Sequence, residues 1–162
     1  MASPETSSGQ VAGYTLVEAL LAVAILALMA ALVLGTGRQQ LAAGRVEAAA
    51  RRLGSELERS RQQAERSGTP LLRALEGPGG LVEEIRSGDA SLELHHNLPA
   101  QLRFTANGLV IDGGTVVISS PGTTLRRCLV MALPLGFTRV GRYGADPGAG
   151  LSSSLCRPDP TL

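Results

Sequence analysis

The apolar residues of this chain are concentrated near its N-terminus. Every residue from Ala19 to Leu34 is apolar, and the uncharged stretch continues to Gly37, which makes nineteen residues before Arg38. A helix of that length measures about 28 Å, close to the hydrocarbon thickness of a bilayer. The pattern therefore predicts that this segment enters a membrane.

Helical periodicity continues beyond the apolar run. Apolar residues recur at intervals of three, four or seven, at Val46, Ala50, Leu53, Leu57 and Ala64. Charged residues occupy the other faces of the helix. The segment Ser67-Gly68-Thr69-Pro70 is a typical helix end, with Gly as the cap and Pro just beyond it. We therefore predict one helix over 14–67, with a transmembrane half (14–37) and an amphipathic half (38–67).

From Leu81 the hydrophobic period changes to two, as in Leu92 and Leu94. Turn signals follow at hairpin spacing, at Asn107-Gly108, Asp112-Gly113-Gly114 and Pro121-Gly122. Residues 68–143 are therefore expected to form an antiparallel sheet of roughly five to seven short strands. The Gly-, Ser- and Pro-rich segment 144–162 is expected to be a loop. The predicted fold class is α+β, a long N-terminal helix packed on an antiparallel β-sheet.

The residues before the apolar run do not fit a cleaved secretory signal. Such a signal begins with basic residues, whereas residues 1–13 contain no Lys or Arg and include Glu5. A plain membrane anchor fits the length but leaves Glu18 unexplained. An acidic residue at the centre of a membrane helix costs about 2.5–3.5 kcal/mol, and less near an end. Such a residue usually has a partner and a function.

The run Gly13-Tyr14-Thr15-Leu16-Val17-Glu18, followed by the apolar helix, resembles the class III signal of type IV pilins and type II secretion pseudopilins. The resemblance implies that a prepilin peptidase removes a leader, residues 1–13, by cutting after Gly13. It then methylates Tyr14, and the helix is retained. Glu18 would pair with the N-terminal amine of a neighbouring subunit during assembly. Family leaders usually carry Lys or Arg before the glycine. Here either the translated leader is misassigned or the insertion machinery sets the orientation.

The segments AAARRLGSELERSRQQAERSGTPL, LRFTANGLVIDGGTVVIS and RRCLVMALPLGFTRVGR resemble the FimT/GspH branch of this family. The resemblance implies a pilin-like fold and a minor type IV pilin, a structural or priming subunit whose activity is assembly rather than catalysis. Two alternatives are a GspH-like pseudopilin of a type II secretion system and a DNA-binding receptor subunit of a pilus for natural transformation.

The same resemblance implies the partners and the location of the protein. The expected partners are the prepilin peptidase, other pilins or pseudopilins in a helical filament, and the inner membrane, with double-stranded DNA added for a receptor subunit. The chain would cross the inner (cytoplasmic) membrane once, with an extracytoplasmic C-terminal domain. After assembly it would lie in a pilus at the cell surface.

Cys128 and Cys156 are the two cysteines of the chain. Both fall in the part expected outside the cytoplasm, where disulfides persist. A disulfide between them is therefore expected, with two free thiols as the alternative. A metal site built on two cysteines would lack further ligands.

The basic residues are unevenly distributed, although the formal net charge is only +1. Residues 101–162 contain six Arg and three Asp, a balance of 6 − 3 = +3. A basic surface on the sheet would bind DNA phosphates without sequence preference; its candidate residues are Arg126, Arg127, Arg139 and Arg142. The alternative is ordinary surface charge, which is favoured by Phe137, because the related segment carries arginine there.

Candidate chemistry is otherwise sparse. The chain has no Lys, which excludes Schiff-base and P-loop chemistry. Its two Tyr and two Phe, without Trp, are too few for a base-stacking platform. His95 and His96 would point to opposite faces of a strand, and no GxSxG surrounds Ser152–Ser154. We therefore expect no catalytic residues, no cofactor and no metal.

Overall fold

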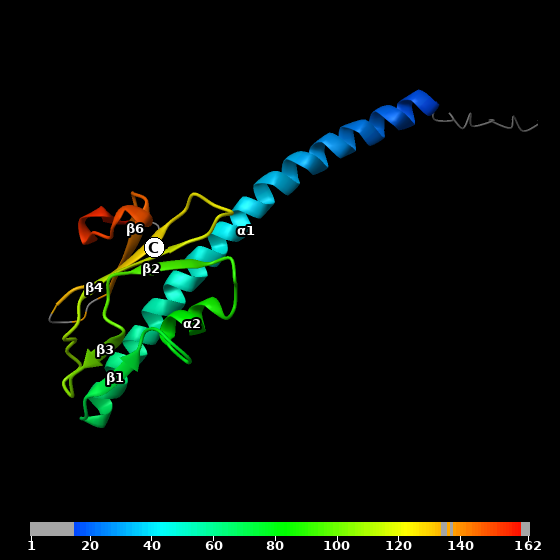
Figure 1. The fold of residues 1–162 in the computed structure, drawn as a ribbon. Coiled ribbons are helices and arrows are strands. Elements are labelled where there is room, and N and C mark those ends of the chain that lie inside the picture. Colours follow the sequence, from blue (N-terminus) through cyan, green and yellow to red (C-terminus); the bar gives the residue numbers. More distant parts are fainter. Residues whose placement is uncertain (1–14, 134–135, 137, 160–162) are drawn as a thin grey trace, which may run out of the picture. The chain divides into compact units, whose positions relative to one another are not determined.

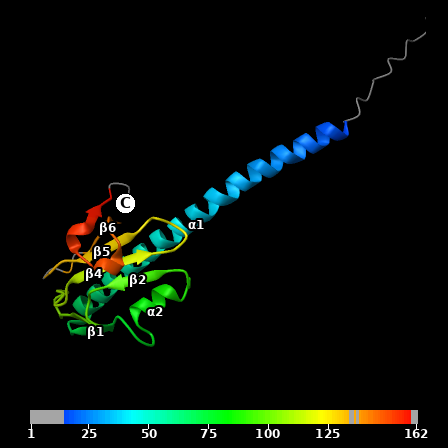
Figure 2. The same cartoon turned by 45° about the horizontal axis from the view of Figure 1, so that its top comes forward.

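The computed structural model describes residues 15–133, 136 and 138–159, without the side chains of residues 32–36. The chain forms two compact units that divide after Gly37. Each unit is described separately below. Figures 1 and 2 show the elements in two views.

Helix α1 spans Leu16–Ser67 and is 52 residues long. At its start the Thr15 hydroxyl accepts a hydrogen bond from the Glu18 backbone N–H at 3.3 Å, which satisfies one of the free donors of the first turn. At its end Gly68 has φ +61°, the left-handed conformation that glycine adopts without a Cβ penalty. The long helix predicted from the sequence is confirmed.

Among the described residues, no helix combines the length and the hydropathy needed to cross a membrane. The predicted span 14–37 also includes Tyr14 and the side chains of residues 32–36, which lie outside the described residues.

In the part of the chain that the structure describes, seven short strands form two antiparallel sheets rather than the single sheet predicted. The first sheet pairs β1 (Leu71–Ala74) with β3 (Gln101–Phe104). The second has the order β2-β4-β5-β6-β7, and its strands are Glu93–His96, Gly114–Ser119, Arg127–Met131, Thr138–Tyr143 and Cys156–Pro158. Neighbouring strands of the larger sheet lie side by side in both views (Figures 1 and 2).

The main core lies between the C-terminal half of α1 and one face of the larger sheet, called here the inner face. Val46, Leu53 and Leu57 of α1 are at most 2% exposed. They belong to one buried cluster with Ile118 of β4 and Leu129 of β5. Burial of this apolar surface is the main favourable term in folding. The expected α+β arrangement, a long helix packed on antiparallel strands, is therefore confirmed in this unit.

A short helix, α2 (Leu81–Arg86), joins the same core. The sequence pattern indicated strand periodicity from Leu81, and that prediction is wrong here. Leu81 and Ile85 lie one helical turn apart and are both buried. Residues four apart lie on the same side of a helix, so this spacing lets a helix bury both side chains in the core. A short apolar run does not by itself distinguish a strand from a helix.

The opposite, outer face of the larger sheet carries a second, smaller core. Val117, Cys128, Tyr143 and Cys156 are buried there, with Ala145 and Leu151 packed against them. The covering segment, residues 144–159, is called the C-terminal strap. It contains two short 3-10 helices, Pro147–Ala149 and Ser153–Leu155, and strand β7. The prediction of a loop over 144–162 is therefore wrong at these positions.

The strap can pair with the sheet because the neighbouring strand carries a glycine at the point of contact. Gly141 of β6 lies opposite Pro158 of β7. A Cβ added at Gly141 would lie 2.2 Å from the Arg157 carbonyl oxygen. Any larger residue there would displace β7. The strand therefore depends on a residue outside the strap, and the composition of the strap alone did not reveal it.

An ion pair holds the segment that follows the Asn107-Gly108 turn against β3. The Asp112 carboxylate accepts hydrogen bonds from the Arg103 backbone N–H at 2.9 Å and from its guanidinium at 3.0 and 2.7 Å. The Arg103 guanidinium holds the pKa of Asp112 below its ordinary value. A carboxylate whose pKa is lower in the folded state stabilises the fold above its unfolded pKa.

We therefore predict that Asp112→Asn destabilises the protein at neutral pH and that this effect shrinks in acid. In the parent chain the contribution of Asp112 is lost as the pH falls through its folded pKa, whereas the variant has none to lose. Urea unfolding of both proteins at pH 7 and pH 3 measures the difference. An equal difference in unfolding free energy at the two pH values would contradict the assignment.

Candidate functional site

The predicted assembly residue Glu18 lies in the first turn of α1 and is exposed. Its backbone N–H is bonded to Thr15, so the helix begins immediately after that residue. A carboxylate in the first turn is favoured by the partial positive charge at a helix N-terminus. The structure therefore places Glu18 near the helix start with its side chain accessible. Gly13 and Tyr14, the predicted cleavage and methylation positions, lie outside the described residues.

The helix around Glu18 presents large apolar side chains to solvent. These side chains are 49–76% exposed, and they are Leu16, Val17, Leu20, Leu21, Val23, Ile25, Leu26, Leu28 and Met29. They are distributed around the helix rather than along one stripe, since consecutive positions are exposed. A soluble monomer rarely exposes so much contiguous apolar surface. Exposed apolar surface of this extent is typical of an interaction surface.

The expected disulfide is confirmed. Cys128 of β5 and Cys156 of β7 are bonded, with their Cα atoms 5.8 Å apart. Both residues are at most 2% exposed. The bond spans β6, which lies between the two strands in the sheet, and attaches the C-terminal strap to the outer face.

The four candidate DNA-binding arginines do not form one patch. In the register of β5 and β6, Arg127 lies opposite Arg142, whereas Arg139 lies opposite Val130. Residues opposite each other point to the same face and alternate residues point to opposite faces. Arg127 and Arg142 therefore lie on the inner face. Arg139 lies on the outer face. Arg126 is four residues from Val130, so alternation along the strand assigns it to the outer face as well.

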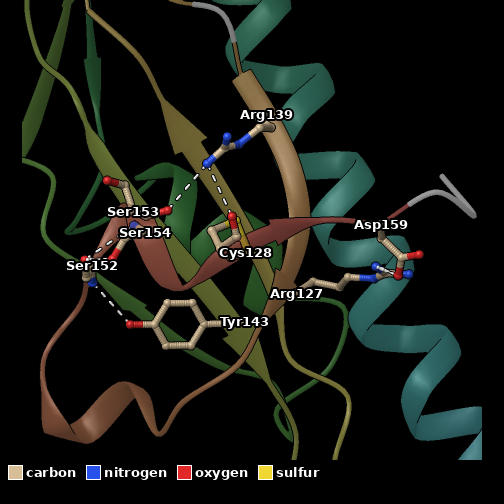
Figure 3. Close-up of a disulfide and its surroundings, with 9 residues drawn as sticks. Arg127, Cys128, Arg139, Tyr143, Ser152, Ser153, Ser154 and Asp159 are labelled. Atoms are coloured by element: carbon tan, nitrogen blue, oxygen red, sulfur yellow. Dashed lines mark hydrogen bonds and ion pairs between the residues drawn. A yellow bond between two sulfur atoms is a disulfide. The ribbon is translucent and has the colours of Figure 1, made fainter.

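Arg127 is buried and bound to two acids. Its side chain is 7% exposed and its Nε donates to a Glu47 oxygen of α1. Its Nη1 donates to Asp159 of the strap at 2.6 Å. Figure 3 shows Arg127 directed toward Asp159 and the helix, away from Arg139. This guanidinium links helix, sheet and strap, and it is unavailable to a phosphate.

Arg126 and Arg139 also contact the strap. Arg126 Nη1 donates to the Ala145 carbonyl at 2.9 Å. Arg139 Nη2 donates to the carbonyls of Ser153 and Cys156 at 3.4 and 3.3 Å (Figure 3). Three of the four arginines thus hold the C-terminal strap in place by hydrogen bonds or ion pairs. Arg142, with a side chain 65% exposed, lies 3.9 Å from Asp159.

Sequence reasoning missed the residues that hold the strap. Tyr143 donates its hydroxyl hydrogen to the Gly150 carbonyl at 3.2 Å and accepts from the Ser152 N–H at 3.1 Å. Glu47 and Asp159 bind Arg127 from positions 80 and 32 residues away. The sequence did contain a signal that the candidate arginines lie on different faces of the sheet. Arg126 and Arg127 are adjacent, and adjacent residues of a strand point to opposite faces.

No cluster of three or more His, Cys, Asp or Glu side chains that could hold a metal ion occurs within residues 15–133, 136 and 138–159. His95 and His96 lie on β2. Ser152 is bonded to Tyr143 and to Ser154 within the strap.

Comparison of the chain with protein-family models, with curated proteins and with solved structures gave no match.

Proposed function

We propose that this chain is a minor type IV pilin, a structural or priming subunit that enters a filament through its N-terminal helix. The observation that carries the proposal is the exposed apolar first half of α1 with Glu18 in its first turn. The confirmed packing of the second half of α1 on antiparallel strands supports it. The proposed subunit is held by its apolar helix in the inner membrane before assembly, with the disulfide-bonded domain outside the cytoplasm.

Glu18 has a specific role in the proposed assembly. A carboxylate surrounded by apolar helices is costly unless it meets a positive charge. Cleavage after Gly13 would create such a charge, the N-terminal ammonium at Tyr14. When the apolar helices of neighbouring subunits bundle together, the carboxylate of one and the ammonium of the next neutralise each other. The pair would therefore favour one axial register between subunits over all others.

The same features would serve a GspH-like pseudopilin of a type II secretion system. The two proposals differ in the filament that contains the subunit, so its recovery with sheared pili or with a secretion apparatus separates them. The arginine geometry does not favour the DNA-receptor alternative. Arg127 is bound to two acids, and Arg126 and Arg139 hold the strap.

The proposal is tested first by the mature N-terminus of the protein. We predict that membrane-extracted protein begins at N-methylated Tyr14 and retains the whole apolar segment, as intact mass and N-terminal sequencing would show. Expression without a prepilin peptidase is the control, and it should leave residues 1–13 attached. Cleavage between Gly35 and Arg38 with release of a soluble chain would refute the pilin proposal.

We further predict that Glu18→Ala blocks assembly without impairing membrane insertion. Removing a carboxylate from an apolar segment makes insertion easier, whereas the amine of the neighbouring subunit loses its partner. The measurement compares the amount of subunit in sheared filaments with the amount in membranes. Glu65→Ala, which removes an acid with a side chain 57% exposed from the second half of α1, is the matched control for filament entry. Equal filament recovery for Glu18→Ala and the parent chain would exclude this role.

A further inference from the structure

The two edges of the five-stranded sheet differ in their free hydrogen-bonding groups. At the β2 edge the pairing with β4 identifies those groups. The Asn97 N–H donates to the Thr115 carbonyl at 3.2 Å, which marks this position as a hydrogen-bonded pair of the ladder. In antiparallel sheets hydrogen-bonded pairs alternate with non-hydrogen-bonded pairs. The next hydrogen-bonded pairs along β2 are therefore His95 with Val117 and Glu93 with Ser119.

The backbone groups of Leu94 and His96 therefore point away from β4. They have no hydrogen-bond partner in the described part of the chain. β2 thus presents two N–H donors and two carbonyl acceptors along one open edge. Unpaired groups of this kind form a template for another strand.

The opposite edge, at β7, is closed. The Gly144 N–H donates to the Leu155 carbonyl, so Arg157 is the β7 residue whose backbone faces β6. Cys156 and Pro158 face outward. The Cys156 carbonyl accepts from Arg139, and Pro158 has no N–H to offer. Proline and charged side chains are common means of protecting a sheet edge. The chain protects β7 in this way and leaves β2 open.

A groove runs beside the open edge. Its volume is about 750 Å³, and both Leu94 and His96 line it. Its far wall comes from α2 and from the segment after β1, and it includes Val82, Pro78 and Glu83. Glu76 closes one side through a contact of its carboxylate with His96 Nε2 at 2.9 Å. Free backbone groups and a groove for side chains therefore lie together.

We propose that β2 is a docking edge for an extended peptide segment of a partner protein, which binds as a sixth strand antiparallel to β2. Main-chain hydrogen bonds to Leu94 and His96 provide affinity, and alternate side chains of the peptide enter the groove. Val82, Pro78 and Leu94 fit an apolar side chain. Two carboxylates, Glu76 and Glu83, against one guanidinium, Arg86, favour a neighbouring basic residue in the peptide.

A partner protein is favoured over a second copy as the occupant. A continuous sheet between copies requires one open edge to meet another, and β7 is closed by Pro158 and Arg139. Pairing of two β2 edges would give a two-fold dimer that uses up both open edges and cannot extend further. A sheet with one open edge therefore has room for a strand from a different chain.

The test removes one backbone donor without touching the sheet. The probe is a displayed library of random linear peptides, selected on the purified full chain in detergent. In His96→Pro the lost N–H is one that β4 does not use, and edge strands tolerate proline. His96→Ala is the matched control, because it also lacks the imidazole but keeps the N–H. We expect selected peptides to bind His96→Pro about tenfold more weakly than His96→Ala, or not at all.

Hydrogen exchange of the parent chain gives an independent measurement that does not depend on the fold of a variant. The amides of Leu94 and His96 should exchange fast in the free protein and slowly with a selected peptide, whereas the His95 amide is protected in both. The proposal is overturned by equal binding to the two variants, by failure to select any peptide, or by protection of Leu94 and His96 in the free chain. Protection that increases with protein concentration would identify a β2–β2 pair instead.

Discussion

Replacing Cys128 and Cys156 together by alanine is expected to lower the free energy of unfolding by about 3.5 kcal/mol, the chain-entropy value for a loop of this length. The disulfide spans 28 positions and is the covalent tie between the outer face of the sheet and the strap. Without it the strap is held by the pairing of β7 with β6, by the packing of Ala145 and Leu151, and by side-chain bonds. Those bonds come from Tyr143, Arg126, Arg127 and Arg139.

Urea unfolding of the full chain in detergent, followed by circular dichroism, measures this effect. A thiol reductant should destabilise the parent chain by a similar amount and leave the double variant unchanged, which separates loss of the bond from loss of cysteine volume. Hydrogen exchange should show β7 opening before β4 and β5 in the variant. An unchanged unfolding midpoint would mean that the non-covalent contacts alone hold the strap.

Arg127→Met is expected to destabilise the protein by about 3 kcal/mol. Removing one partner of a buried ion pair typically costs about 3–5 kcal/mol, because the remaining charge is left without compensation. Here Glu47 and Asp159 would both lose their buried partner. The lower end of the range applies because Arg51 and Arg142 still contact these acids from more exposed positions.

The matched control is Arg142→Gln. Arg142 lies directly opposite Arg127 in the sheet and belongs to the same cluster, but its side chain is 65% exposed. Its replacement should change the unfolding free energy by less than about 1 kcal/mol, as is usual for exposed ion pairs. Equal effects of the two substitutions, measured by urea unfolding, would show that burial of Arg127 does not determine the stability of the cluster.

The parts of this fold that the sequence predicts are those that depend on local pattern. Helix α1 follows from the three- and four-residue spacing of Val46, Ala50, Leu53 and Leu57 and from the Gly68 stop. The turn at Asn107-Gly108 follows from the left-handed backbone that Gly108 adopts, with φ +72°. The disulfide follows from the presence of two cysteines in a segment expected outside the cytoplasm.

The parts that the sequence did not predict depend on distant partners. Whether Arg127 is a surface charge or a buried one depends on Glu47, which lies on another element, and on the strap that brings Asp159 to it. The strap in turn depends on one glycine, Gly141, that allows β7 to approach β6. A charge balance over 101–162 counts residues without regard to the face on which each one lies. It therefore indicated a basic surface where the structure has internal ion pairs and carbonyl contacts.

The unequal edges of the five-stranded sheet also bear on aggregation. Amyloid-like growth requires every added molecule to present a fresh pairing edge to the next. In this sheet Pro158 and Arg139 close the β7 side, so stacking of sheets edge to edge ends after two molecules that meet through β2. The domain can therefore be concentrated with its β2 edge open and still lack a route to an endless cross-β ladder through this sheet.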